Sequence, residues 1–102
     1  MVKNTLSKEN ISNYINIQKN IMNEKRLQIL LLLQTEQKSW SQLMQELDLR
    51  NPKLLHDHIS TLRLANLIEK NDKGFYQNTK FGETWLTANI KLMNTLNKND
   101  QK

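Results

Sequence analysis

The stretch from Ser41 to Gly74 constrains the fold most, because two helical patterns, a short break and a tight turn follow one another within it. Leu43, Met44 and Leu47 recur at spacings of three and four, which predicts a short helix with one apolar face. Ser41 stands where a hydroxyl can accept from the free amides of a first turn. We therefore expect this helix to begin near Ser41, with Ser41 as its cap.

A second helix is predicted to begin at Pro52, because proline has a fixed φ and no N–H and suits the first turn of a helix. Asn51 is its expected N-cap. A helical wheel of residues 52–66 separates two sides. The side expected to face the core carries Leu55, His58, Ile59, Leu62 and Ala65. The side expected to face a partner carries Lys53, His56, Asp57, Ser60, Arg63 and Leu64.

A β-hairpin pattern follows the second helix. Leu67 and Ile68 begin a β-prone run, the Asn71-Asp72-Lys73-Gly74 segment has turn chemistry, and Phe75-Tyr76 begins a returning run. A short helix, a turn, a longer helix and a hairpin in this order predict a winged helix-turn-helix. The fold class is thus mainly α with a small β-hairpin wing, an α+β arrangement.

The line HDHISTLRLANLIEKNDKGFYQNTKFG resembles winged-helix DNA-binding proteins of the ArsR/MarR-like and archaeal small winged-helix type. The resemblance covers about residues 24 to 86 and departs from the usual pattern twice. Asn66 stands where Gly is usual, although Asn can adopt the left-handed conformation needed at a helix end, and the turn before the second helix is one residue longer. The matching positions are His58-Ile59, Leu62, Asn66-Leu67-Ile68, Tyr76, and Thr79 with Gly82.

Helices are also predicted on both sides of this core. The segment from Ser7 to Met22 is periodic, with Ser7 as a cap, and Asn23 opens a segment whose centre is apolar nearly all round, so it should be a buried scaffold helix. Ser39-Trp40 is interpreted as a short first strand of the wing sheet, and Trp40 as a packing residue.

A last long helix is predicted from Lys80 to Asn97, before a polar tail at residues 98–102. It carries two apolar stripes, which is more than a terminal helix needs to pack on a small domain, so we expect a homodimer formed by this helix and by the 7–22 helix. The simpler alternative is that both stripes pack against the body of the same chain. The residues expected at the dimer interface are Phe81, Trp85, Leu86, Ile90, Leu92, Met93 and Leu96.

Composition limits the number of domains, the kind of partner and the cysteine chemistry that the chain can have. With 102 residues, 37% hydrophobic and 25% charged, the chain fits a single domain over residues 1–102, with its winged core at 23–79. The net charge of +5 suits an anionic partner. The lack of cysteine excludes disulfides and thiolate sites. The first residues lack the apolar core of a signal peptide and no run is long enough to span a bilayer, so a cytoplasmic, nucleoid-associated protein without membrane contact is expected.

Neither metal chemistry nor catalysis is indicated. His56 and His58 are two apart on a helix and point in different directions, so they cannot chelate one ion together. No triad spacing, glycine-rich phosphate loop or paired-carboxylate motif is present. The sequence predicts no enzyme and no cofactor.

The predicted function is sequence-selective binding of double-stranded DNA, with the 52–66 helix in the major groove. Lys53 and Arg63 could contact phosphate or guanine, and Asp57 could accept from cytosine or orient a neighbouring cation. Ordinary solvated polar residues would give the same pattern. The expected DNA-binding residues are Ser41, Gln42, Asn51, Lys53, His56, Asp57, Ser60, Arg63, Lys70 and Lys73.

Several biological roles are compatible with DNA binding by this fold. The resemblance implies a dimeric transcription regulator that binds inverted-repeat operators. A plasmid or phage partition or replication-control adaptor, and a chromosomal architectural protein, are alternatives with the same fold. A winged helix that binds protein and makes no DNA contact is a further alternative.

Overall fold

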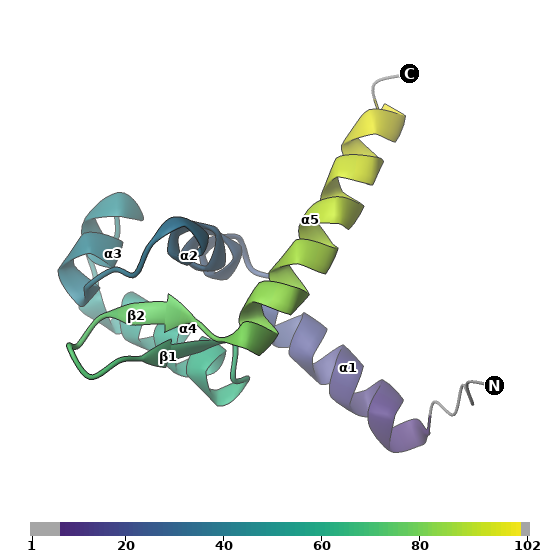
Figure 1. The fold of residues 1–102 in the computed structure, drawn as a ribbon, viewed down its shortest axis with the longest axis horizontal. Helices are drawn as coiled ribbons and strands as arrows, with labels where there is room; N and C mark the ends of the chain where they lie inside the picture. The colour runs from purple at the N-terminus through teal and green to yellow at the C-terminus, as the bar shows by residue number, and fades with distance from the viewer. Residues whose placement is uncertain (1–6, 101–102) are drawn as a thin grey trace.

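The computed structural model describes residues 7–100 (Figure 1). Residues 1–6, on which the expectation of no signal peptide rests, and residues 101–102 of the expected polar tail lie outside the described part. The elements in chain order are α1 (Lys8–Ile21), α2 (Glu24–Thr35), α3 (Trp40–Glu46), α4 (Pro52–Leu64), β1 (Ile68–Lys70), β2 (Tyr76–Asn78) and α5 (Lys80–Asp100).

Short polar side chains fix where three of the helices begin. Ser7 accepts a hydrogen bond from the backbone N–H of Asn10 at 3.1 Å, and Asn23 accepts from that of Arg26 at 3.1 Å. Asn51 likewise accepts from the N–H of the second residue of α4 at 2.9 Å, beside Pro52 at its first turn. These caps confirm the predicted starts of α1, α2 and α4.

The start of α3 differs from the prediction. Trp40 is its first residue and Ser39, rather than Ser41, is its N-cap. The Ser39 hydroxyl accepts from the Gln42 N–H at 3.1 Å, while the Gln42 side-chain oxygen accepts from the Ser39 N–H at 2.7 Å. This reciprocal capping box satisfies two free amides at once, which a cap at Ser41 could not do.

The expected strand at Ser39-Trp40 is also wrong, because the strand-like pairing lies one residue earlier, at Lys38. Lys38 forms an isolated antiparallel bridge with Tyr76, with N···O distances of 3.0 and 2.7 Å between their backbones. The strand-like pairing therefore ends before the capping box starts. Trp40 is half-buried and packs against the core, as predicted, with its ring centroid 6.5 Å from that of Tyr76.

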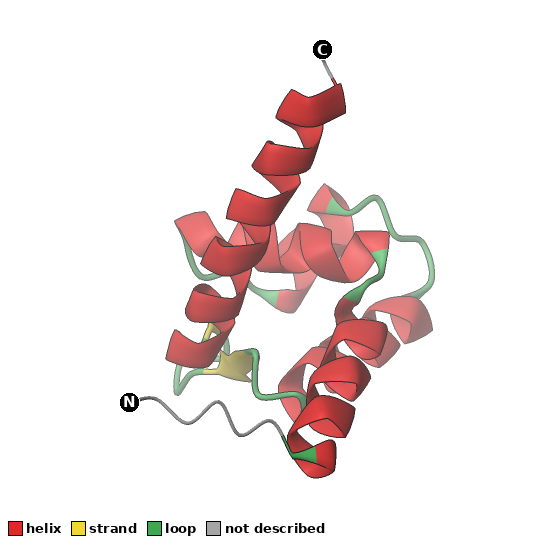
Figure 2. Ribbon diagram, turned by 90° about the vertical axis from the view of Figure 1, so that its right-hand side faces the viewer, coloured by secondary structure: helices red, strands yellow, loops and turns green. Residues whose placement is uncertain are grey.

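The hairpin β1–β2 is antiparallel and pairs Ile68 with Asn78 and Lys70 with Tyr76. Figure 2 shows it as the small β element of an otherwise helical structure. Asn66, between α4 and β1, has a φ of 63°, so it takes the left-handed conformation expected where Gly is usual. Gly74 has a φ of 88° in the hairpin turn, where glycine avoids a steric cost.

The core lies between α2, α3, α4 and the hairpin, and α1 and α5 each add one buried residue to it. The centre of α2 contributes Ile29, Leu30 and Leu33, which confirms its role as scaffold helix, although Leu31 is exposed. Helices α1 and α5 project from the same side of this body and diverge toward the two termini (Figure 1). The buried hydrophobic residues are Ile21, Ile29, Leu30, Leu33, Leu43, Leu47, Leu55, Ile59, Leu62, Leu67, Ile68, Tyr76 and Leu86.

The joint between the hairpin and α5 explains the Thr79 and Gly82 positions of the family pattern. The Thr79 hydroxyl donates to the Asn66 carbonyl at 2.7 Å and accepts from the Gly82 N–H at 2.9 Å. A Cβ at Gly82 would overlap the carbonyl oxygen of Leu67. Helix α5 then continues to Asp100, three residues past the predicted end at Asn97. Among the described residues, no helix combines the length and the apolar character needed to cross a membrane.

Candidate nucleic-acid interface

Helix α4 divides into a buried side and an exposed side as the helical wheel predicts. Leu55, Ile59 and Leu62 are buried in the core, and His58 and Ala65 are half-buried. On the other side Ser60 is half-buried, while the remaining polar side chains are exposed. The core thus fixes which side chains α4 presents to solvent, and the exposed ones include Lys53, His56, Asp57, Arg63 and the apolar Leu64.

The cations on the exposed side of α4 form no salt bridge with any described carboxylate. Both salt bridges in the part of the chain that the structure describes are made by Lys38, so Lys53 and Arg63 have no carboxylate partner there. Asp57 is therefore not engaged in orienting either cation. Its carboxylate is free to accept a hydrogen bond, the role that a cytosine amino group would use.

Helix α3 and the turn after it flank α4. Ser41 is exposed on the first turn of α3, and Gln42 uses its side-chain oxygen in the capping box, which leaves its amide N–H groups as donors. Arg50 is an exposed cation next to Asn51, the cap of α4. Arg50 was not among the residues predicted to contact DNA, although it is a basic residue next to the predicted cap of α4.

The wing is organised around Asn71. Its side-chain oxygen accepts from the N–H of Lys73 at 3.0 Å and of Phe75 at 3.1 Å, while its amide donates to Gln37 at 2.6 Å and Gln77 at 3.2 Å. The turn is therefore held to the segment before α3 by side chains. Because the turn is held in this way, the backbone of the exposed Lys73 at its tip is fixed relative to the domain.

Lys70, the other cation expected from the wing, is partly engaged. Its ammonium lies 5.6 Å from the centroid of the Tyr76 ring, within reach of a cation–π contact. Lys70 is nevertheless exposed. Of the two wing lysines, Lys73 is the one at the hairpin tip and the better placed for a phosphate beyond the edge of the domain.

A buried lysine links the wing to α3, and no local sequence pattern marked it. The Lys38 ammonium lies 3.0 Å from a Glu46 carboxylate oxygen and 3.5 Å from one of Glu36. The hydrogen bond to Glu46 raises the pKa of Lys38 above its usual 10.5, against the opposing effect of burial. Since Glu46 ends α3 and the Lys38 backbone pairs with Tyr76, this residue fixes α3 relative to the hairpin.

The residues expected at a dimer interface differ in how deeply they are buried. Leu86 is fully buried in the core of its own chain, so it cannot belong to a surface. Trp85, Ile90 and Met93 are half-buried. Exposed apolar residues lie on both α1 and α5: Ile11, Tyr14, Ile15, Phe81, Leu92 and Leu96.

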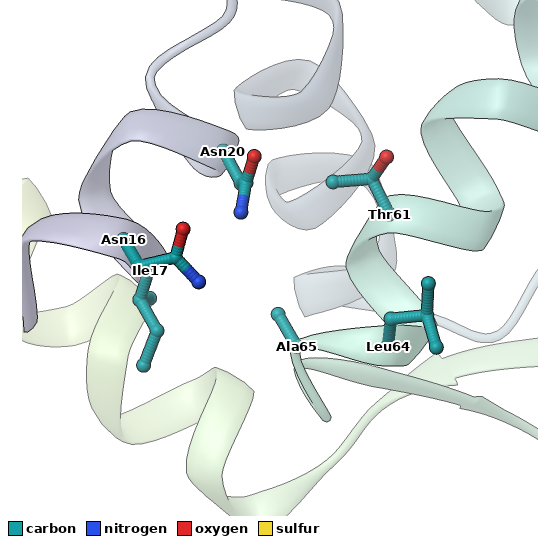
Figure 3. A pocket seen from close by; sticks show the side chains of 6 residues that line it. All are labelled: Asn16, Ile17, Asn20, Thr61, Leu64 and Ala65. Carbon is teal, nitrogen blue, oxygen red and sulfur yellow. The ribbon is translucent and has the colours of Figure 1, made fainter. Parts of the chain in front are cut away.

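A hollow of about 470 Å³ lies between α1 and the last turns of α4 (Figure 3). Figure 3 shows Asn16, Ile17 and Asn20 of α1 on one side and Thr61, Leu64 and Ala65 on the other. Apolar contact between the two helices is therefore incomplete there. Within the described residues no group of three histidine or carboxylate side chains is placed to hold a metal ion.

Comparison with known proteins agrees with this geometry. A family model described as bacterial regulatory protein, arsR family, matches residues 23–70. The structure of HlyU from Vibrio cholerae N16961 is 28% identical, with a TM-score of 0.70 over 88% of this chain and 97% of that chain. A transcriptional regulator HlyU from Vibrio vulnificus CMCP6 is 28% identical, with a TM-score of 0.60 over 87% and 92%. A search of curated proteins gave no match. The predicted fold and family resemblance are confirmed.

Proposed function

We propose that this chain, whose residues 23–70 carry the helix-turn-helix of the arsR family of bacterial regulatory proteins, binds operator DNA as a homodimer and places α4 in the major groove. A DNA-binding transcriptional regulator is the function class that the family match and the fold support. What we propose beyond this class is the homodimer, the insertion of α4 into the major groove and the residues that contact DNA.

The observation that carries the proposal is the exposed polar side of α4. A helix fits the major groove of B-DNA, where side chains on its outer face meet base edges. The opposite side of α4 is anchored by fully buried Leu55 and Leu62. The helix therefore offers a fixed row of donors and acceptors, with the exposed cations Lys53 and Arg63 near its two ends.

The flanking elements supply contacts to the DNA backbone. Arg50 beside the cap of α4, Ser41 and Gln42 on α3, and Lys73 at the wing tip provide cations and hydrogen-bond donors around α4. Asn51 is already used as the cap of α4 and contributes through the position of that helix. Contacts of this kind set register on the duplex, while Lys53, Asp57 and Arg63 read bases.

Dimerisation is proposed because apolar side chains stand exposed on the two helices that leave the body together. Leu92 and Leu96 are 58% and 55% exposed on α5, beyond the part of that helix that packs on the core. A second copy would bury them with Ile11 and Tyr14 of α1. A twofold dimer would present two α4 helices to half-sites about 34–36 Å apart along the duplex.

The test is fluorescence anisotropy of the purified protein with genomic and random duplexes at several salt concentrations. The proposal expects selective binding that weakens with a slope of about −0.9 per neutralised phosphate in a log–log plot. The double variant Lys53→Glu, Arg63→Glu should abolish it. Lys98→Glu, a charge reversal near the far end of α5, is the matched control and should bind nearly as the parent does.

The other outcomes separate the competing roles. Tight binding without selectivity would indicate an architectural protein, and footprints over a repeated array would indicate a partition or replication-control adaptor. Binding that survives reversal of Lys53 and Arg63 would remove α4 from the interface. No binding to any duplex would favour a protein-interaction module.

A further inference from the structure

We infer that Arg26 is a positioning residue that couples α1 to α4 through neutral His58, so that protonation of His58 uncouples the two helices and weakens DNA binding. The inference rests on the proposed function, since it needs DNA binding as its readout. It assigns a role to the inward side of α4, which makes no contact with DNA.

One guanidinium joins three helices. Arg26 lies in the first turn of α2, and its Nε–H donates to Nδ1 of His58 on α4 at 3.1 Å. Its Nη1 donates to the backbone carbonyl of Asn20, in the last turn of α1. The Arg26 side chain therefore contacts the proposed dimer helix and the proposed recognition helix at the same time.

The chemistry of the pair fixes the protonation state of His58. Arginine has only donors, so Nδ1 of His58 must present its lone pair and the ring must be neutral. A second proton on the ring would occupy Nδ1. The hydrogen bond to Arg26 would then be lost, and two cations would face each other.

The surroundings favour the neutral form. The charged groups around the ring are Arg26 and Lys25 from α2 and Asp57 beside it on α4. Partial burial, and then the Arg26 guanidinium, lower the pKa of His58 below its usual 6.5, and Asp57 opposes this only in part. Protonation of His58 therefore belongs to mildly acidic conditions.

Helix α1 is anchored at its last turns, where Ile21 is fully buried in the core and Ile17 packs against it. Beside this anchor, a hollow lined by Asn16, Asn20 and Leu64 lies between α1 and α4 (Figure 3). The polar link through Arg26 adds to the apolar contact of α1 in setting the angle between the two helices. If α1 helps to form the dimer, its angle to α4 decides whether both α4 helices of the dimer reach successive major grooves.

The second histidine gives an opposing effect that can be measured separately. His56 is exposed on the outer side of α4, with Nε2 3.5 Å from the Ser60 hydroxyl. A positive charge at this position would face DNA and should strengthen binding. The chain contains two histidines in all, so His56→Gln leaves His58 as the remaining imidazole.

The experiment measures DNA affinity from about pH 7.5 to about pH 5.5, the range where histidine titrates. It compares the parent, His56→Gln, the double variant His56→Gln, His58→Gln, and Arg26→Gln. In His56→Gln, which removes the opposing effect, acid should weaken binding by about tenfold or more, the equivalent of one hydrogen bond to a charged group. The double variant His56→Gln, His58→Gln keeps an acceptor for Arg26. Its affinity for DNA at all pH values should equal that of His56→Gln at a pH where the His58 ring is neutral. Arg26→Gln should bind weakly throughout.

Each result decides the matter. Acid weakening that persists in the double variant would overturn the inference, and so would a flat profile in His56→Gln. Helix content by circular dichroism and mass by light scattering are followed in parallel, and a loss of affinity that merely tracks unfolding would also overturn it. Absence of DNA binding at every pH would instead refute the proposed function, and the inference would fall with it.

Discussion

The indole Nε1 of Trp85 donates a hydrogen bond of 2.7 Å to the side-chain oxygen of Gln18. The two residues are far apart in the sequence, and the bond ties α5 to α1 within one chain. Since these helices carry the exposed apolar residues, the bond helps to set the shape of the surface that a second copy would meet.

Replacing Gln18 with alanine should lower the free energy of unfolding by about 1–3 kcal/mol, because the partly buried indole N–H loses its partner. Urea denaturation followed by circular dichroism measures this cost. In a Trp85→Phe background there is no indole N–H to leave unpaired, so Gln18→Ala should cost clearly less. An equal cost in both backgrounds would mean that the bond contributes nothing.

Leu62 and Leu64 provide a matched pair on one helix. Leu62 is fully buried and Leu64 is 89% exposed. Leu62→Ala should destabilise the protein by about 2–5 kcal/mol through loss of burial and the cavity left behind, whereas Leu64→Ala should change stability by no more than about 0.5 kcal/mol. Thermal or urea unfolding in the absence of DNA tests both, and similar costs would contradict the assigned orientation of α4.

Much of the fold follows from local sequence signals. Caps at Ser7, Asn23 and Asn51 and the periodicity of α4 define helices that the structure confirms, because these signals act within one helical turn. The turn residues of the Asn71–Gly74 segment likewise predicted the hairpin, which the structure confirms. The cap at Ser39 was missed although its Ser-x-x-Gln signature is local, because the apolar spacing of α3 also fits a start at Ser41.

The parts that the sequence could not supply depend on distant residues. A lysine is rarely buried, and Lys38 is buried only because Glu46 and the Tyr76 backbone meet it in the fold. The same holds for Leu86, whose place in the core rather than on a surface depends on how α5 crosses the body. The link between Arg26 and His58 likewise joins two helices that no local pattern relates.

Substitutions that introduce charge on the outer part of α5 should convert the proposed dimer into a monomer. Leu92 and Leu96 are exposed in the single chain, so Leu92→Glu with Leu96→Glu should leave the fold intact while placing carboxylates in any apolar interface. Light scattering should show the mass change from that of two chains to that of one. Thr95→Glu, an exposed position between them, is the control for added charge, and an unchanged mass in the double variant would refute this surface.

Loss of the wing-tip cation should weaken binding evenly across DNA sequences. Lys73→Ala is expected to lower affinity for operator and random duplexes by the same factor and to reduce the salt slope by about 0.9, if Lys73 neutralises one phosphate. Anisotropy titrations at several salt concentrations measure both quantities. A change confined to one operator would show instead that Lys73 reads bases.

The ion pairs of Lys38 should make stability depend on alkaline pH. The pKa of Lys38 is raised in the folded state, so its contribution is complete below 10.5 and is lost as the pH rises through the folded-state value. The stability advantage of the parent over Lys38→Met should therefore shrink above about pH 10.5. Lys98→Met, at an exposed position, should show no such change relative to the parent.

The contact between Gly82 and Leu67 has a mechanical consequence. The backbone of α5 touches the backbone just before β1 with no space for even one carbon atom between them, and Thr79 ties the same two segments by hydrogen bonds. The base of α5 and the segment that leads into the wing are therefore in direct backbone contact, with no side chain between them that could rearrange. A tilt of α5 about its base would require this segment to move with it.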